Sequence, residues 1–185
     1  MSAPKIAVLV GSLRKDSVTR KVVRAIEPFA PGLSFTELEL GHLPLYNQDL
    51  EVEPPPEAWA AFRAQLNESA GYLFATPEYN RSIPGGLKNA IDIASRPYGK
   101  SAFGAGRPGA VVSVSPGAMG GFGANHQVRQ SVVSLDLVML QRPEMYVNNA
   151  LTLFDASGAL VDEAAKRLFH NFGTAFTAWV QRHAR

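Results

Sequence analysis

Short, unbroken apolar runs recur along the chain, and segments with helical spacing separate them. The clearest runs lie within residues 5–10, 71–76 and 110–114, and each is too short for an ordinary helix. Because such a run has no polar face, both of its faces must be covered, as in a parallel sheet between two layers of helices. We therefore predict a buried strand at each of these three places.

The segments between these runs predict the remaining elements. Apolar residues at three- and four-residue spacing predict helices over 17–29, 57–70, 86–95, 125–140 and 163–182. Weaker strand patterns cover 33–40 and 144–148. The resulting order, βαβαβαβαβα, predicts an α/β three-layer sandwich: a five-stranded parallel sheet with helices on both faces.

Nothing in the chain divides it, so we expect a single domain over residues 1–185. The one long irregular segment is 41–56, which contains four prolines. A loop of this length is often functional. It can equally be a surface crossover packed by Leu43, Leu45 and Tyr46, and both interpretations remain open.

Composition excludes several classes of function. The chain is 46% hydrophobic and 18% charged, which is typical of a globular protein, and it has no cysteine for a disulfide or a thiolate nucleophile. The net charge is only +2 and the basic residues are scattered, so we expect no nucleic-acid partner. No apolar stretch approaches the ~20 residues that span a bilayer. We expect no membrane association and, because no leader precedes the first strand, a cytoplasmic location.

A hydroxyl-rich turn joins the first strand to the first helix and is a candidate anion site. Unpaired N–H groups at a helix start, together with the helix dipole, favour a negative charge there. The turn lacks both the three glycines of dinucleotide folds and the Gly-Lys-Ser/Thr of nucleoside-triphosphate loops. A monophosphate fits it better, and the candidate residues are Gly11, Ser12, Arg14, Ser17 and Thr19. An ordinary helix capped by Asp16 or Ser17 is the alternative.

Two further loops follow buried strands at the same predicted edge of the sheet, where open α/β sheets bind ligands. The first is polar, aromatic and stiffened by proline, and its candidate residues are Pro77, Glu78, Tyr79 and Asn80. The second is rich in glycine, which allows close approach to a flat ligand, and its candidate residues are Ser115 and Gly117. The three loops together predict a mononucleotide site with an extended ring, for which FMN fits best. We assign no acid–base role to Glu78.

The sequence also resembles the NADPH-dependent FMN reductase family, whose members are flavodoxin-like and include quinone- and chromate-reducing enzymes and some azoreductases. The matching segments are Gly11-Ser-Leu-Arg-Lys-Asp-Ser, Pro44-Leu-Tyr, Thr76-Pro-Glu-Tyr-Asn, Ser82-Ile-Pro-Gly-Gly-Leu-Lys-Asn-Ala-Ile-Asp, Ser115 with its glycines, Arg129-Gln and Arg142-Pro-Glu. The resemblance implies FMN contacts at Ser12, Arg14, Ser17, Pro77, Glu78, Tyr79, Asn80, Ser115 and Gly117. Thr19, Arg81 and Pro116 depart from the family pattern, and the last two affect substrate preference.

These observations predict an FMN-dependent oxidoreductase. NAD(P)H would reduce the flavin, and a quinone, azo compound, metal oxyanion such as chromate, or free flavin would then be reduced in a ping-pong cycle, with no obligatory catalytic side chain. The resemblance implies a homodimer or homotetramer, with Arg129 and Glu144 near subunit contacts. The alternatives are a flavodoxin-type electron carrier, which binds FMN without reacting with NAD(P)H, and a module that binds a nucleotide without redox chemistry.

Overall fold

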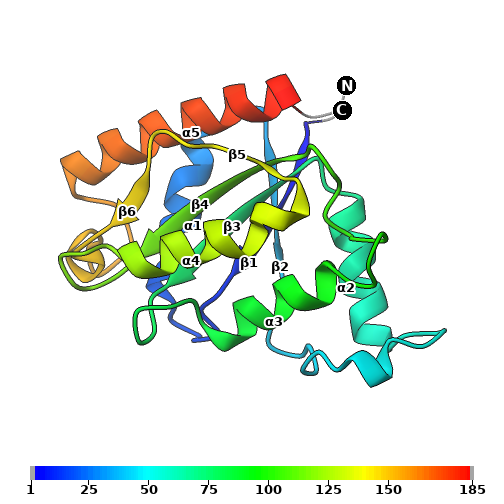
Figure 1. Cartoon of the computed structure of the whole chain (residues 1–185). Coiled ribbons are helices and arrows are strands. Elements are labelled where there is room, and N and C mark those ends of the chain that lie inside the picture. The colour runs from blue at the N-terminus through cyan, green and yellow to red at the C-terminus, as the bar shows by residue number, and fades with distance from the viewer. Residues whose placement is uncertain (1–2, 184–185) are drawn as a thin grey trace.

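The computed structural model describes residues 3–183, and its strands form one parallel sheet (Figure 1). The strands are β1 (Lys5–Val10), β2 (Ser34–Leu38), β3 (Gly71–Pro77), β4 (Pro108–Val114), β5 (Val138–Met139) and β6 (Met145–Val147). Their order is β2-β1-β3-β4-β5, and β6 also pairs with β4. This 2-1-3-4-5 order is that of flavodoxin-like folds, as the resemblance implied.

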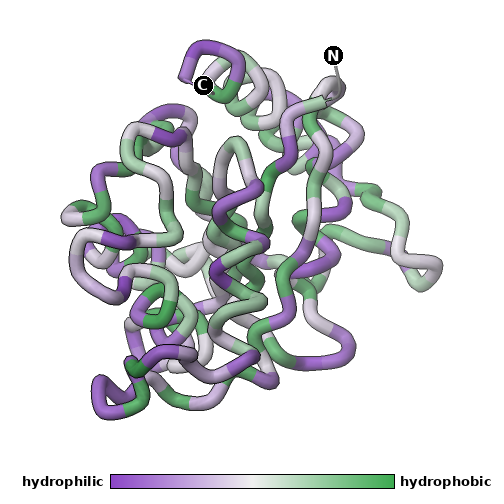
Figure 2. Tube along the Cα trace, turned by 90° about the vertical axis from the view of Figure 1, so that its right-hand side faces the viewer, coloured by the Kyte–Doolittle hydropathy of each residue, from purple (hydrophilic) through white to green (hydrophobic). Residues whose placement is uncertain are grey.

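Helices cover both faces of the sheet, which confirms the predicted three layers (Figure 1). The helices are α1 (Val18–Ile26), α2 (Glu57–Asn67), α3 (Gly85–Ala94), α4 (Phe122–Val132) and α5 (Glu163–His183), with short 3-10 turns η1 (Glu27–Phe29), η2 (Gln48–Leu50), η3 (Val133–Leu135) and η4 (Ala150–Thr152). Helices α1 and α5 bury one apolar core, and α2, α3 and α4 bury the other. Figure 2 shows hydrophobic and hydrophilic residues alternating along these helices, as expected for elements with one buried face.

The predicted helix over 125–140 is wrong in both bounds. Helix α4 starts at Phe122 and ends at Val132, and the chain then turns into strand β5. Asp136 has the left-handed φ of 55°, and its carbonyl accepts from the N–H of Gly106 at 2.7 Å. The next strand residue, Val138, donates to Arg107 at 3.0 Å. Pairing with the start of β4 therefore overrides the helical spacing of the apolar residues.

The strand predicted over 144–148 exists as β6, and the sheet has one further short strand, β5, which lies within the predicted helix over 125–140. Strand β5 pairs with the start of β4, where Pro108 lies opposite Val138, and β6 pairs with its end, where Val112 lies opposite Met145. The sheet thus has the five predicted positions, with two short strands sharing the last one. Among residues 3–183, no helix is long and apolar enough to cross a membrane.

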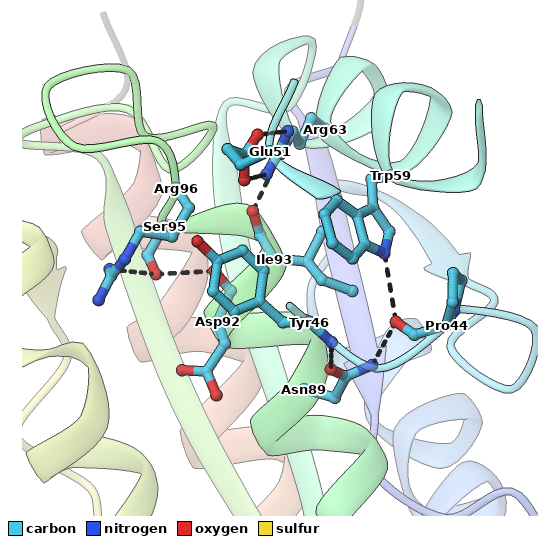
Figure 3. A network of polar contacts seen from close by, with 10 residues as sticks. All are labelled: Pro44, Tyr46, Glu51, Trp59, Arg63, Asn89, Asp92, Ile93, Ser95 and Arg96. Carbon is cyan, nitrogen blue, oxygen red and sulfur yellow. Dashed lines mark hydrogen bonds and ion pairs between the residues drawn. The ribbon is translucent and has the colours of Figure 1, made fainter. Parts of the chain in front are cut away.

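The long segment 41–56 is a packed crossover, held by Asn89 of α3 (Figure 3). The Asn89 side chain accepts from the N–H of Tyr46 at 2.8 Å and donates to the carbonyl of Pro44 at 3.1 Å. Trp59 of α2 donates to the same carbonyl at 3.2 Å, and its ring stacks on that of Tyr46 with centroids 5.4 Å apart. Leu43 is buried as expected, whereas Leu45 is 78% exposed and does not pack.

A largely buried ion pair fixes the far end of this segment. Both Nη atoms of Arg63 donate to the Glu51 carboxylate at 2.8 Å, and its Nε donates to the Ile93 carbonyl at 2.9 Å (Figure 3). Each side chain of the pair is only 12% exposed. Since all three guanidinium nitrogens are satisfied, the pair joins the crossover to both α2 and α3.

Candidate functional site

The loops that carry the candidate residues leave adjacent strands at one edge of the sheet. Val10, the last residue of β1, lies opposite Ala75 of β3, and Pro77 at the end of β3 lies opposite Val114 of β4. The first loop (residues 11–17), the second loop (78–84) and the third loop (115–121) therefore start side by side. This is the carboxyl edge, where open parallel sheets bind their ligands.

The first loop ends in a capped helix start that leaves donors available. Ser17 is the N-cap of α1, and its Oγ accepts from the N–H of Arg20 at 3.2 Å. The capped-helix alternative is thus partly correct, with Ser17 rather than Asp16 as the cap. The N–H groups of Val18 and Thr19 have no partner within the helix because they lie in its first turn. The anion-site interpretation remains compatible with this geometry.

Exposure separates the candidate side chains of the first loop. Ser12, Ser17 and Thr19 are 4%, 3% and 1% exposed, whereas the Arg14 side chain is exposed. Arg14 is therefore the side chain of this set that can reach an anion in solution. Thr19 would act through its backbone N–H instead of its hydroxyl.

The first and second loops enclose a common cavity of about 360 Å³. It is lined by Gly11, Leu13, Arg14, Tyr79, Pro84, Gly85 and Gly86. A Cβ on Gly11 would lie 3.3 Å from atoms of both Leu87 and Pro84, so this glycine lets the loop pack closely on the start of α3. The structure thus brings together the Arg14 cation, the N-terminus of α3 and the Tyr79 ring.

Arg20 is a residue of this edge that the sequence analysis did not find. Its Nε donates to the two carboxylate oxygens of Glu37 at 2.7 and 3.0 Å. Its Nη atoms donate to the carbonyls of Arg14 at 3.0 Å and Ser12 at 3.4 Å. In the sequence Arg20 is one more cation on a helix, and no local signal marks these contacts.

A tight turn shapes the second loop. Tyr79 and Ser82 exchange N–H···O=C bonds at 2.9 and 3.0 Å, and the two residues between them, Asn80 and Arg81, have φ of 51° and 65°. Positive φ at both central positions is the geometry of a type I′ turn, in which Asn-Gly is the preferred pair. Arginine in the glycine position is strained, and its side chain is exposed.

Glu78 joins the second loop to helix α4. Its Oε2 accepts from the N–H of Ala124 at 2.9 Å, in the first turn of α4, and the side chain is 13% exposed. A Cβ on Gly123 would lie 2.6 Å from the Arg81 carbonyl, so the turn and the helix start are in close contact. The carboxylate caps a helix N-terminus, a favourable place for a negative charge. Such a carboxylate is tied to the backbone and is not poised for proton transfer.

The third loop folds back on itself and on β6. The Oγ of Ser115 accepts from the N–H of Gly117 at 3.1 Å, and Gly117 and Pro116 are exposed. Gly120 has φ of 59°, and a Cβ there would lie 2.7 Å from the backbone of Tyr146. Only glycine permits this close approach.

An aromatic group borders the third loop. The rings of Phe122, His126 and Tyr146 lie 4.2 to 6.1 Å apart, and His126 Nδ1 is 2.9 Å from the Phe122 carbonyl. The Tyr146 hydroxyl donates to Glu144 at 2.8 Å. Burial, followed by this bond and the Glu144 charge, raises the pKa of Tyr146 to about 12. Arg129 donates to Asn125 at 3.0 Å and to the Leu140 carbonyl at 3.2 Å.

A larger cavity, about 540 Å³, lies elsewhere. It is bordered by Lys21, Arg24 and Phe29 on one side and by Phe154, Leu160 and Lys166 on the other. None of the candidate residues lines it. The conjunction of loop, helix N-terminus and sheet edge is absent there, so the smaller cavity is the functional candidate.

A doubly wound parallel sheet of this strand order, with three loops at the carboxyl edge where such sheets bind their ligands, defines a flavodoxin-like protein. The model of one family, NADPH-dependent FMN reductase, matches residues 4–152. The chain belongs to this family, and it is an oxidoreductase with FMN as cofactor and NAD(P)H as co-substrate. The sequence-based resemblance is confirmed.

Similar proteins cover nearly the whole chain. A quinone reductase of Pseudomonas putida is 56% identical over 177 residues, covering 95% of this chain and 94% of that protein. A 2-hydroxy-1,4-benzoquinone reductase of Burkholderia sp. is 43% identical and covers 97% of each. The solved structure of the flavoenzyme NAD(P)H:(acceptor) oxidoreductase FerB from Paracoccus denitrificans superposes with a TM-score of 0.91 at 38% identity, covering 98% of this chain and 100% of that one.

Proposed function

We propose that this protein is a single-domain, FMN-dependent NAD(P)H:quinone oxidoreductase. The observation that carries the proposal is the cavity in which the first loop, with its exposed Arg14, meets the type I′ turn of the second loop. The names of similar proteins favour quinones as acceptors. Azo compounds, chromate-like oxyanions and free flavin remain further candidate acceptors.

The residues at this edge fit FMN. We propose that the phosphate lies against Gly11, Ser12, Arg14, Ser17 and Thr19. The ring would lie between the second and third loops, at Pro77, Glu78, Tyr79, Asn80, Ser115 and Gly117. Since the Glu78 carboxylate already binds the start of α4, Glu78 would contact the ring through its backbone.

When bound, FMN would supply the redox chemistry between the nicotinamide and the acceptor. The chain's own residues bind and orient. Arg14 offers a charged donor, the helix N-terminus offers unpaired N–H groups, and the turn at Asn80 holds its backbone in one geometry. The loops around Tyr79 and Gly117 are exposed, so one open face would serve donor and acceptor in turn. This supports ping-pong kinetics and requires no catalytic side chain.

Assembly and location are part of the proposal. Met119 and Phe122, at the junction of the third loop and α4, are 60% and 46% exposed, and Val133, just beyond the other end of α4, is 77% exposed. We propose that these exposed apolar side chains along α4 are covered in a homodimer or homotetramer with the site near the interface. Light scattering would measure the assembly, and cell fractionation would test the proposed cytoplasmic location.

The test is a pair of measurements on the purified protein. Its visible spectrum, alone and after addition of FMN, should show bound flavin. Anaerobic NADPH should bleach this absorbance, and a quinone should restore it. Parallel lines in two-substrate plots would support the ping-pong cycle. A protein that stays yellow with NADPH and NADH would be a carrier of the flavodoxin type, and one that binds no flavin would overturn the proposal.

A further inference from the structure

Two backbone carbonyl groups of the first loop are held by the side chain of Arg20. Arg20, in the first turn of α1, donates to the carbonyls of Ser12 and Arg14, and its remaining nitrogen is held by Glu37 of β2. The guanidinium thus links three separate pieces of chain. Its side chain is 23% exposed, so it lies largely beneath the loop and not on its surface.

These bonds determine which way the loop's donors face. In a trans peptide the C=O and the following N–H point in opposite directions. The carbonyl of Ser12 shares its peptide with the N–H of Leu13, and that of Arg14 shares its peptide with the N–H of Lys15. Because both carbonyls turn toward Arg20, both N–H groups turn away from it. Successive N–H groups aimed at one side of a loop form a site for an anion.

We expect an anion on the side of the first loop that faces away from Arg20. Leu13 and Arg14 line the cavity shared with the second loop. Helix α1 follows this loop directly in the chain, and its first turn has unpaired N–H groups of its own. The same loop would therefore direct donors from two peptides and one helix end at a single point.

Glu37 shows that the role of Arg20 is one of geometry. Its carboxylate binds Nε at 2.7 and 3.0 Å, which neutralises the guanidinium locally and fixes its plane. A cation placed to attract phosphate by charge would not carry a bound carboxylate.

We propose that Arg20 is a positioning residue that orients the first loop for a terminal phosphate and thereby selects a phosphorylated over an unphosphorylated flavin. This inference rests on the proposed FMN site. Arg20 touches the loop and not the cofactor. It turns the N–H groups of Leu13 and Lys15 toward the phosphate, and Glu37 keeps it in place.

The test compares two ligands that differ only in the phosphate. Full-length protein stripped of flavin is titrated with FMN and with riboflavin, and the dissociation constants come from quenching of flavin fluorescence. Arg20→Met should weaken FMN binding about tenfold or more, the equivalent of one or two net hydrogen bonds, and change riboflavin binding by less than about twofold. Arg20→Lys should recover part of the loss, because one ammonium replaces some of the donors.

Two further variants make the test specific. Arg24→Met removes an equal charge from the exposed side of the same helix and should leave both constants unchanged. Glu37→Gln removes the neutralising charge; if Arg20 acted by simple attraction, FMN would bind more tightly, and that result would overturn the proposal. Equal losses for FMN and riboflavin in Arg20→Met would show a general structural role instead. A wild-type protein that binds neither flavin would overturn the proposed function itself.

Discussion

Replacing Glu78 tests whether the second and third loops are held together by a helix cap. The Glu78 carboxylate accepts from the N–H of Ala124, which is the third residue of α4 and has no helical partner. The N-cap residue itself, Gly121, has no side chain to supply this bond. Glu78 therefore supplies, from the second loop, the capping hydrogen bond that an N-cap serine or aspartate supplies at many other helix starts.

The magnitude follows from this geometry. Loss of an N-cap side chain costs about 0.5–2 kcal/mol, and a negative charge at a helix start adds about 0.3–1 kcal/mol. We expect Glu78→Ala to lower the free energy of unfolding by about 2 kcal/mol. For a domain of this size that is a fall in Tm of roughly 4–8 °C. Glu78→Gln keeps an acceptor oxygen and should cost only about 0.5 kcal/mol, the charge contribution.

The assay is urea and thermal unfolding of the FMN-loaded protein, with the FMN dissociation constant measured in parallel. Glu53→Ala, which removes an exposed acid from the 41–56 crossover, is the matched control and should change neither quantity. Glu78→Ala should also weaken FMN, because the turn at Asn80 loses its attachment to α4. Stability within about 0.5 kcal/mol of wild type for Glu78→Ala, or equal damage from Gln and Ala, would refute the capping argument.

Three other outcomes follow from the site. Arg14→Ala should weaken FMN retention by about 1.5–3 kcal/mol through loss of a charged hydrogen bond, and unchanged retention in equilibrium dialysis would place that side chain in solvent. Arg81→Gly should raise the free energy of unfolding by about 1 kcal/mol, because glycine adopts positive φ freely; a lower Tm would contradict the strain. Tyr146 has a folded pKa of about 12, above its ordinary value of 10, so its contribution to stability is present below pH 10 and is lost as pH rises toward 12. The stability difference between wild type and Tyr146→Phe should therefore shrink over that interval, and a difference titration at about 295 nm should show a late-ionising tyrosine.

The buried strands were predictable because their signal is local. Runs such as 71–76 and 110–114 are apolar on both faces, and the structure places them as β3 and β4 in the middle of the sheet. The helix over 125–140 was wrong because its end is decided elsewhere. Asp136 and Val138 bond to Gly106 and Arg107, the two residues just before β4, and helical spacing carries no information on such partners.

The positions of the three loops were predictable for the same reason. Strand–loop–helix spacing was enough to locate Ser17 at a helix start and to place the three loops at one edge. The contacts that shape these loops join distant residues: Arg20 meets Glu37 of another element, and Glu78 meets Ala124, 46 residues away. A single sequence shows that these side chains can make bonds, but it does not show with what.

The packed crossover 41–56 determines where a tag can be inserted into this protein. Although residues 41–51 contain little regular structure, hydrogen bonds to the side chains of Asn89, Trp59 and Arg63 fix them to α2 and α3. Beyond Glu51 these anchors end, and Val52 is 61% exposed. An affinity tag or a reporter domain should therefore be inserted at 52–54. The same insertion a few positions earlier would disrupt the crossover and expose one side of the sheet.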